Sequence, residues 1–340
     1  MGELLVWTVG VFVWGLLWGS FANVVIWRVP RGLSVVAPPS ACVRCGAGIR
    51  WYHNVPLLGW VALRGSCADC GAPVSARYPL VELCGGLLSL LMWLHVLGPG
   101  AARWWDVAPL DLLLVWMMLT YLMIGLLALT VIDLEHALLP HALTGGLALL
   151  GVVFALLAPE GLAWRGFVPA VGWLDSVLGF VAGWGVLYLV ATGYALATGR
   201  VGMGGGDLML LGAIGAWLGW RALPVVLMWA SWQALLVVVV AVLVARVGGR
   251  ASGTAGTGRP GDAGAGLLRD GSVEGFWEAR TAAEARAVDQ RASGPVRSGS
   301  GRERASARLG LSFGPFLALA TLEYVLWGGV FARWMGFGTW

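Results

Sequence analysis

Long apolar runs separated by short polar segments dominate this chain. Most runs reach the length of about 20 residues that a helix needs to cross a lipid bilayer. A hydropathy count predicts eight helical spans. Their approximate bounds are 4–26, 79–97, 110–132, 142–158, 172–197, 207–220, 222–246 and 310–333. The pattern therefore predicts an all-α, polytopic membrane helix bundle.

Composition supports this fold class and excludes an ordinary soluble domain. The chain is 59% hydrophobic and 12% charged, with a mean hydropathy of +0.79, whereas soluble domains carry about 25% charged residues. The first apolar run follows Glu3 and is preceded by no basic residue. Because a cleavable signal peptide has a basic start and a shorter apolar region, we expect this run to remain as a membrane helix.

The arginines predict how the bundle is oriented. Residues 27–78 contain six arginines and one acid, Asp69. Short loops rich in basic residues stay in the cytoplasm, so this segment should be cytoplasmic. Counting spans from it places the N- and C-termini outside a cytoplasmic (inner) membrane. The same count places Asp133 and Asp207 at the cytoplasmic boundary of the membrane.

Composition divides the chain into five parts. We expect a first transmembrane helix (1–26), a cytoplasmic tetracysteine domain (27–78), a membrane core (79–246), a cytoplasmic linker (247–309) and a last transmembrane helix (310–340). The linker is rich in Gly, Ala, Ser and Arg, and such segments bury too little apolar surface to fold. We therefore expect it to be disordered. No internal repeat with a period of 20–50 residues is evident.

Four of the five cysteines form two C-x-x-C pairs, Cys42 with Cys45 and Cys67 with Cys70. Two such knuckles together supply four thiolates, the ligand set of a closed structural zinc site. Disulfides are rare in the cytoplasm. Redox-active thiols and an empty site are the alternatives. Cys84 stands alone within an apolar run, and we expect it to pack as a small hydrophobic residue.

Two acidic residues lie where apolar runs meet polar turns. Asp133 ends the third span, and Asp207 follows the glycine turn Gly204, Gly205 and Gly206. Singly, Asp133 could be a solvated helix end and Asp207 a helix N-cap. Together, two carboxylates at one membrane depth match the aspartic-protease arrangement, in which one carboxyl is protonated and the other activates water. The glycines would let a substrate backbone approach Asp207.

The order of several motifs resembles the type IV prepilin peptidases, a family of GxGD-type membrane aspartic peptidases also called leader peptidase/N-methyltransferases. The resemblance covers most of the chain. Its motifs here are Gly19 to Pro30, the cysteine pairs, Asn54 to Trp60, Leu63 to Cys70, Ser75 to Glu82, Gly204 to Asp207, and Phe313 to Ala318. One departure is Pro140-His141, where the family usually has Pro-Asp or Pro-Asn.

The resemblance implies a two-step activity. The enzyme would remove the basic leader from type IV prepilins or pseudopilins at the cytoplasmic membrane face, then methylate the new N-terminus with S-adenosylmethionine. Asp133 and Asp207 would be catalytic, within a peptidase core at 79–246. The four paired cysteines would hold zinc. Glu82 is a further candidate, for the methyl-donor region.

Two alternative functions remain open. The chain could be a peptidase without methyltransferase activity, or a non-enzymatic membrane transporter or scaffold, because intramembrane acids also relay protons. The expected partners are prepilin precursors and the bilayer, with no nucleic acid. The sequence does not select between pili, type II secretion and DNA uptake, and it does not give the oligomeric state.

Overall fold

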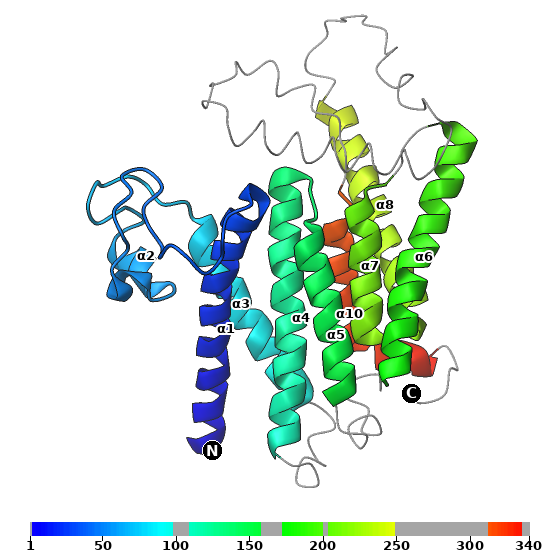
Figure 1. The fold of residues 1–340 in the computed structure, drawn as a ribbon, viewed down its shortest axis with the longest axis horizontal. Coiled ribbons are helices and arrows are strands. Elements are labelled where there is room, and N and C mark those ends of the chain that lie inside the picture. Colours follow the sequence, from blue (N-terminus) through cyan, green and yellow to red (C-terminus); the bar gives the residue numbers. More distant parts are fainter. Residues whose placement is uncertain (1, 98–108, 158–171, 200–202, 249–311, 335–340) are drawn as a thin grey trace, which may run out of the picture.

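A computed structural model of the chain describes residues 2–97, 109–157, 172–199, 203–248 and 312–334 (Figure 1). Most of the predicted linker at 247–309 lies outside these residues. The long helices are α1 (Gly2–Arg28), α3 (Arg77–Val96), α4 (Pro109–His136), α5 (His141–Leu157), α6 (Trp173–Thr198), α7 (Gly205–Leu218), α8 (Leu223–Gly248) and α10 (Gly314–Trp334). The short helix α2 (Leu58–Ala62) lies between α1 and α3.

The prediction of an all-α membrane bundle with a small tetracysteine domain is confirmed in the described residues. Each of the eight predicted spans corresponds to one long helix, and consecutive helices run in alternating directions (Figure 1). Five of the helices are long and apolar enough to cross a membrane, and α5 and α7 are shorter apolar helices. The described residues form two isolated β-bridges, and no extended β-strand is found among them.

Glycines let α1 and α3 approach each other closely. A Cβ added at Gly15 would lie 2.5 Å from the carbonyl oxygen of Gly85, and one at Gly19 would lie 2.8 Å from the Cα of Glu82. Gly15 and Gly19 are one helical turn apart, the small-residue spacing that membrane helices use for close packing. Ser89 of α3 then donates a 2.7 Å hydrogen bond to the carbonyl of Val11.

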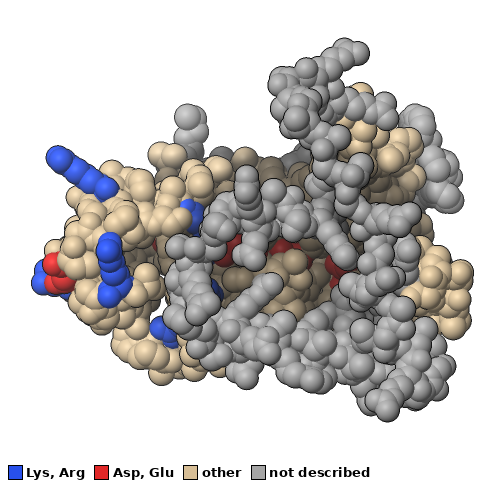
Figure 2. Space-filling view, turned by 90° about the horizontal axis from the view of Figure 1, so that it is seen from above, with Lys and Arg blue, Asp and Glu red and all other residues tan. Residues whose placement is uncertain are grey.

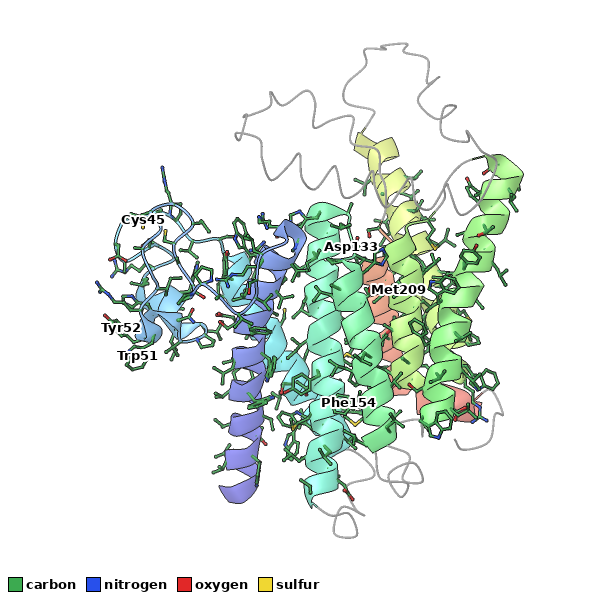
Figure 3. The ribbon with its side chains drawn as sticks, viewed as in Figure 1. Cys45, Trp51, Tyr52, Asp133, Phe154 and Met209 are labelled. Atoms are coloured by element: carbon green, nitrogen blue, oxygen red, sulfur yellow. The ribbon has the colours of Figure 1, made fainter. Side chains whose placement is uncertain are left out.

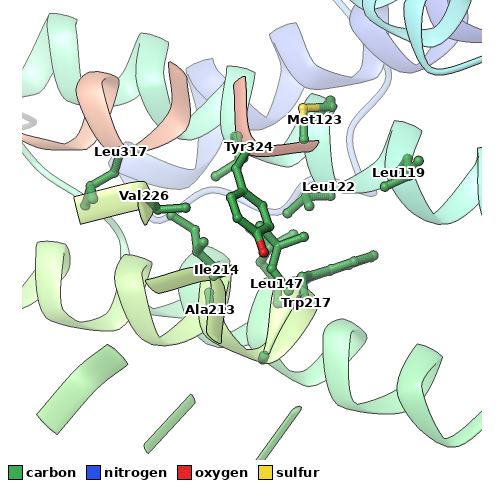
Figure 4. Close-up of a cluster of buried hydrophobic side chains, with 14 of the residues drawn as sticks. Leu119, Leu122, Met123, Leu147, Ala213, Ile214, Trp217, Val226, Leu317 and Tyr324 are labelled. Carbon is green, nitrogen blue, oxygen red and sulfur yellow. Dashed lines mark hydrogen bonds between the residues drawn. The ribbon is translucent and has the colours of Figure 1, made fainter. Parts of the chain in front are cut away.

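Helix α7 is the centre of the second half of the bundle. It packs on α6 through Gly183, where an added Cβ would lie 2.5 Å from the carbonyl oxygen of Leu211. Ser176 of α6 donates a 2.6 Å hydrogen bond to the carbonyl of Ala216 in α7. Figure 4 shows Ile214 and Trp217 of α7 among side chains from α4, α5, α8 and α10. Ten of its fourteen residues are buried, so α7 lies in the interior of the bundle.

The segment between α1 and α3, here called the tetracysteine domain, contains two knuckles with the same backbone hydrogen bonds. In the first, Cys42 N–H donates to Ala47 and Gly46 N–H donates back to Cys42, each at 2.9 Å. In the second, Cys67 N–H donates to Ala72 at 2.8 Å and Gly71 N–H to Cys67 at 2.9 Å. The expectation of no internal repeat is therefore wrong, because Cys-x-x-Cys-Gly-Ala recurs 25 positions later.

Candidate functional site

Asp133 lies in the last turn of α4, and its side chain is only 4% exposed. Figure 3 shows it at the end of the bundle where α4 ends. Its Oδ2 accepts a hydrogen bond from the hydroxyl of Ser312, 179 residues away in sequence. The backbone of Gly314, the first residue of α10, also closely approaches this carboxyl group. The hydroxyl just before α10 therefore orients the buried acid.

Gly314 leaves no room for a side chain beside Asp133. A Cβ built on it would overlap Asp133 Oδ2 and would lie 3.4 Å from Leu139 Cδ1. Gly314 itself is buried. The backbone of α10 can reach the carboxylate only because this residue is glycine.

Asp207 is the third residue of α7 and is half-buried. Gly204 is the N-cap of α7, so the interpretation of Asp207 as an N-cap is wrong. The backbone N–H of Asp207 donates to the carbonyl of Gly204 at 3.2 Å. A negative side chain in the first turn interacts favourably with the positive end of the helix dipole.

Leu139, in the turn between α4 and α5, contacts the surroundings of both acids. A Cβ built on Gly206, the residue before Asp207, would lie 2.5 Å from Leu139 Cβ. Leu139 is 6% exposed and also borders Gly314, which touches Asp133. The structure thus places Asp133 and Asp207 at the same end of the bundle, in segments that share one buried leucine. Viewed from above, acidic surface is visible at this end (Figure 2).

An ion pair joins this end of α4 to the start of α3. Arg77 Nη1 lies 2.7 Å and 2.6 Å from the two carboxylate oxygens of Glu135. The side chains are 21% and 35% exposed, respectively. Arg77 also lies over the ring of Tyr78, 4.9 Å from its centroid. The arginine-rich segment and Asp133 are therefore on the same side of the membrane bundle.

The four paired cysteines converge on one point. Their sulfur atoms all lie within 4.8 Å of one another, and Cys42 Sγ is 3.9 Å from Cys70 Sγ. In a tetrahedral site with metal–sulfur bonds of about 2.3 Å, neighbouring sulfurs are about 3.8 Å apart. Gly46 and Gly71 follow the knuckles with φ of +73° and +67°, a conformation that glycine adopts readily. The four cysteines could therefore bind a metal ion.

The pKa values of Cys42 and Cys45 move in opposite directions. Backbone hydrogen bonds from Cys45 and Arg44 lower the pKa of Cys42 to about 6. At Cys45 the backbone hydrogen bond from Ala47 lowers the pKa, but contacts with other thiols, Cys70 first, raise it to about 11. Four adjacent thiolates repel one another, and a bound cation removes this repulsion.

Glu82 lies at the junction of α1, α2 and α3. Its Oε2 accepts a 2.8 Å hydrogen bond from the backbone N–H of Leu57, the residue before α2. Gly19 of α1 packs against the backbone of Glu82. The carboxylate thus attaches the tetracysteine domain to α3. Cys84, two residues later, is exposed on α3, so the expectation that it packs in the interior is wrong.

Sequence reasoning did not identify Ser312, Leu139 or Arg77 as parts of this site. Phe313 to Ala318 forms a recognisable motif, but nothing in the motif shows that its start touches Asp133. The contact joins residues on either side of the 247–309 linker. Spacing along the chain carries no information about such a contact, whereas the acid and the glycine turn are recognisable from their apolar surroundings.

Two family models match the chain. The bacterial peptidase A24 N-terminal domain matches residues 13–96, and the type IV leader peptidase family matches residues 120–241. These ranges contain the four paired cysteines and both acids. No solved structure matches the chain.

Curated relatives carry the name prepilin leader peptidase/N-methyltransferase. The protein from Aeromonas hydrophila is 42% identical over 245 residues, covering 65% of this chain and 76% of the relative. The one from Neisseria gonorrhoeae is 38% identical, covering 67% and 80%. The one from Pseudomonas aeruginosa is 36% identical, covering 71% and 81%. Identity of this extent, over three quarters or more of each relative's length, means that the chain belongs to the prepilin leader peptidase/N-methyltransferase family.

Proposed function

We propose that this protein is a membrane aspartic endopeptidase that removes the leader from type IV prepilins or pseudopilins and then N-methylates the new terminus. The observation that carries the peptidase assignment is the buried Asp133, oriented by Ser312 and closely approached by Gly314, beside the segment that carries Asp207. A buried acid with a dedicated donor, at one end of an apolar bundle, is a functional arrangement.

In the proposed reaction the two carboxyl groups hold one proton between them, because two like charges in one buried site do not both ionise. The ionised carboxylate takes a proton from a water molecule, which attacks the scissile carbonyl carbon. The protonated carboxyl donates to the developing oxyanion, and the leaving amine receives a proton. Gly204 and Gly205 would let an extended substrate backbone approach Asp207, whereas Gly206, also expected from the sequence to admit substrate, packs against Leu139.

We place the catalytic end of the bundle at the cytoplasmic face of an inner membrane. The Arg77–Glu135 ion pair supports this, because it holds the arginine-rich segment next to Asp133. Segments rich in arginine stay on the cytoplasmic side. The N- and C-termini then lie outside. We also propose the domain boundaries predicted from the sequence, with new domains beginning at residues 27, 79, 247 and 310.

We assign zinc to the four cysteines as a structural ion. Cys42, Cys45, Cys67 and Cys70 would hold it, and the 3.9 Å approach of Cys42 to Cys70 supports a tetrahedral thiolate set. The ion would tie the two knuckles together in a domain with few buried apolar side chains. Four protein ligands leave no open position, so this ion has no part in peptide cleavage.

S-adenosylmethionine is the proposed methyl donor, on the strength of the relatives' names. Glu82, the sequence-based candidate for this region, uses one carboxylate oxygen to bind the Leu57 N–H. The described residues therefore support a positioning role for Glu82, and its part in donor binding stays a prediction. No step through the donor is derived from these residues.

The test uses the full chain in liposomes with a purified prepilin. Asp133→Asn and Asp207→Asn should each abolish leader removal, because neither amide can exchange the proton that the reaction needs. Asp111→Asn is the matched control, since Asp111 lies in the first turn of the same helix at the opposite end of the bundle. Mass spectrometry of the pilin N-terminus measures cleavage and methylation separately.

The outcomes discriminate among the three functions. Normal cleavage by either Asn variant would overturn the peptidase assignment. Cleaved pilin with an unmodified N-terminus, from the unaltered protein supplied with S-adenosylmethionine, would indicate a peptidase without methylation. Proton or ion flux in liposomes without any cleavage would indicate a transporter.

A further inference from the structure

The tetracysteine domain presents an apolar face that no other described residue covers. Trp51 is 83% exposed, Leu58 is 68% exposed and Val61 is 64% exposed. Tyr52, beside Trp51, is 48% exposed. Leu58 and Val61 are three residues apart in α2, so they share one side of that helix. These four exposed residues, on two helices that pack together, are called the α2 face.

The α2 face is held rigidly. The 3₁₀ helix Trp51–Asn54 packs against α2 so closely that a Cβ on Gly59 would overlap the carbonyl of His53. On α2, Trp60 donates a 3.1 Å hydrogen bond to Val74, beyond the second knuckle. The exposed apolar side chains therefore belong to an ordered element rather than to a loose loop.

A hydrogen bond to α3 fixes the position of the α2 face along the axis of the bundle. Glu82 binds the N–H of Leu57, and Glu82 is five residues into α3. At 1.5 Å per residue, Glu82 lies about 7.5 Å along α3 from its first residue, and its side chain binds Leu57. Figure 3 shows Trp51 and Tyr52 at the lower edge of the domain, toward the level of the N-terminal half of α1, and Cys45 near the upper edge.

We infer that the α2 face inserts into the interfacial region of the lipid leaflet, on the side of the membrane that carries Asp133. The neighbouring helices also expose apolar side chains, at Leu17 and Phe21 of α1 and Leu80 of α3, as helices that contact lipid do. Trp and Tyr favour the membrane–water interface. The cytoplasmic location of this leaflet rests on the proposed function, but the insertion does not.

Charge favours lipid as the occupant over a basic peptide. Arg44, Arg50 and Arg64 of the same domain are exposed. Figure 2 shows the basic side chains on this part of the molecule. Arg50 adjoins Trp51, and its Nη1 lies 3.4 Å from the Tyr52 hydroxyl oxygen. Arg50, at the edge of the apolar face, attracts anionic lipid head groups and repels a basic leader segment, and Arg44 and Arg64 add exposed positive charge elsewhere on the domain.

The test places an environment-sensitive fluorophore on the full chain in lipid nanodiscs. The dye is attached through an azidophenylalanine that replaces Trp51 or, as the matched control, Val43, which is 73% exposed between the cysteines of the first knuckle. Lipids with a nitroxide near the head group serve as quencher. At position 51 the lipids should quench most of the emission and shift it to the blue. At position 43 the emission should stay sensitive to aqueous iodide.

Leu58→Glu combined with Val61→Glu should remove the quenching at position 51, while leader removal persists. If aqueous iodide still quenches the emission at position 51 in nanodiscs, the inference is overturned. Protection that appears only when prepilin is added would overturn it too, because the face would then bind substrate. Equal quenching at both positions would mean that the face has no preference for the bilayer.

Discussion

The hydroxyl of Ser312 donates a hydrogen bond to Asp133 across a separation of 179 residues. Asp133 lies in the last turn of α4, whereas Ser312 shortly precedes α10. The contact brings the last helix of the bundle to the buried acid, next to the glycine that lets α10 approach. The orientation of the proposed catalytic carboxyl thus depends on a helix that follows the 247–309 linker.

Replacement of Ser312 tests this dependence. Ser312→Ala should lower kcat for leader removal by about ten- to a hundredfold, because a hydrogen bond to a charged group contributes about 1.5–3 kcal/mol. Ser312→Thr keeps the hydroxyl and should restore most of the rate. Methylation of pre-cleaved pilin should be unaffected in both. A kcat for Ser312→Ala equal to that of the unaltered protein would show that the hydroxyl does not position Asp133.

Gly314→Ala should be more damaging than an ordinary Gly→Ala change in a helix. The added methyl group would overlap Asp133 Oδ2, so either the carboxyl or the start of α10 must shift. We expect a large loss of leader removal with protein still inserted in the membrane. Gly146→Ala is the control, because nothing lies within 4 Å of a Cβ there. Cleavage assays on both variants, at equal amounts of folded protein, make the comparison; equal activities would contradict the expectation.

The tetracysteine domain should lose its structure when its metal is removed. A strong zinc chelator, or Cys67→Ser, should expose Arg44, Arg50 and Arg64 to rapid trypsin cleavage, because the ion joins the two knuckles. Cys84→Ser should change nothing, since Cys84 lies on α3 away from the cluster. Elemental analysis should find about one zinc per chain. Trypsin resistance that survives chelation, with no metal found, would exclude a structural ion.

The Arg77–Glu135 pair should couple α3 to α4 measurably. A double-mutant cycle with Arg77→Ala and Glu135→Ala should give a coupling free energy of about 1 kcal/mol, reduced by salt, because the pair is partly exposed. The comparison is Arg50 with Asp69, which are 3.7 Å apart with side chains 56% and 42% exposed. That cycle should give a value near zero. Similar values in both cycles would mean that the closer contact contributes no additional stability.

The helices of this protein follow from local chemistry. Eight apolar runs predict eight helices because a backbone in lipid must satisfy its own hydrogen bonds, whatever the neighbouring helices are. The cysteine pairs and the acid after a glycine turn are equally visible in the sequence, because thiols at C-x-x-C spacing are typical of metal sites and a charge in apolar surroundings is costly. The close packing of α1 on α3 could also have been inferred from Gly15 and Gly19.

Packing across the bundle decided which of these features contact one another. Ser312 with Asp133, Leu139 between Gly206 and Gly314, and Glu82 with Leu57 are contacts between segments distant in sequence. Hydropathy gives each helix a length and a direction, but not its neighbours, because lipid and a helix partner are almost equally apolar. Close packing and buried hydrogen bonds choose the neighbours, and both depend on atoms brought together only when the bundle has formed.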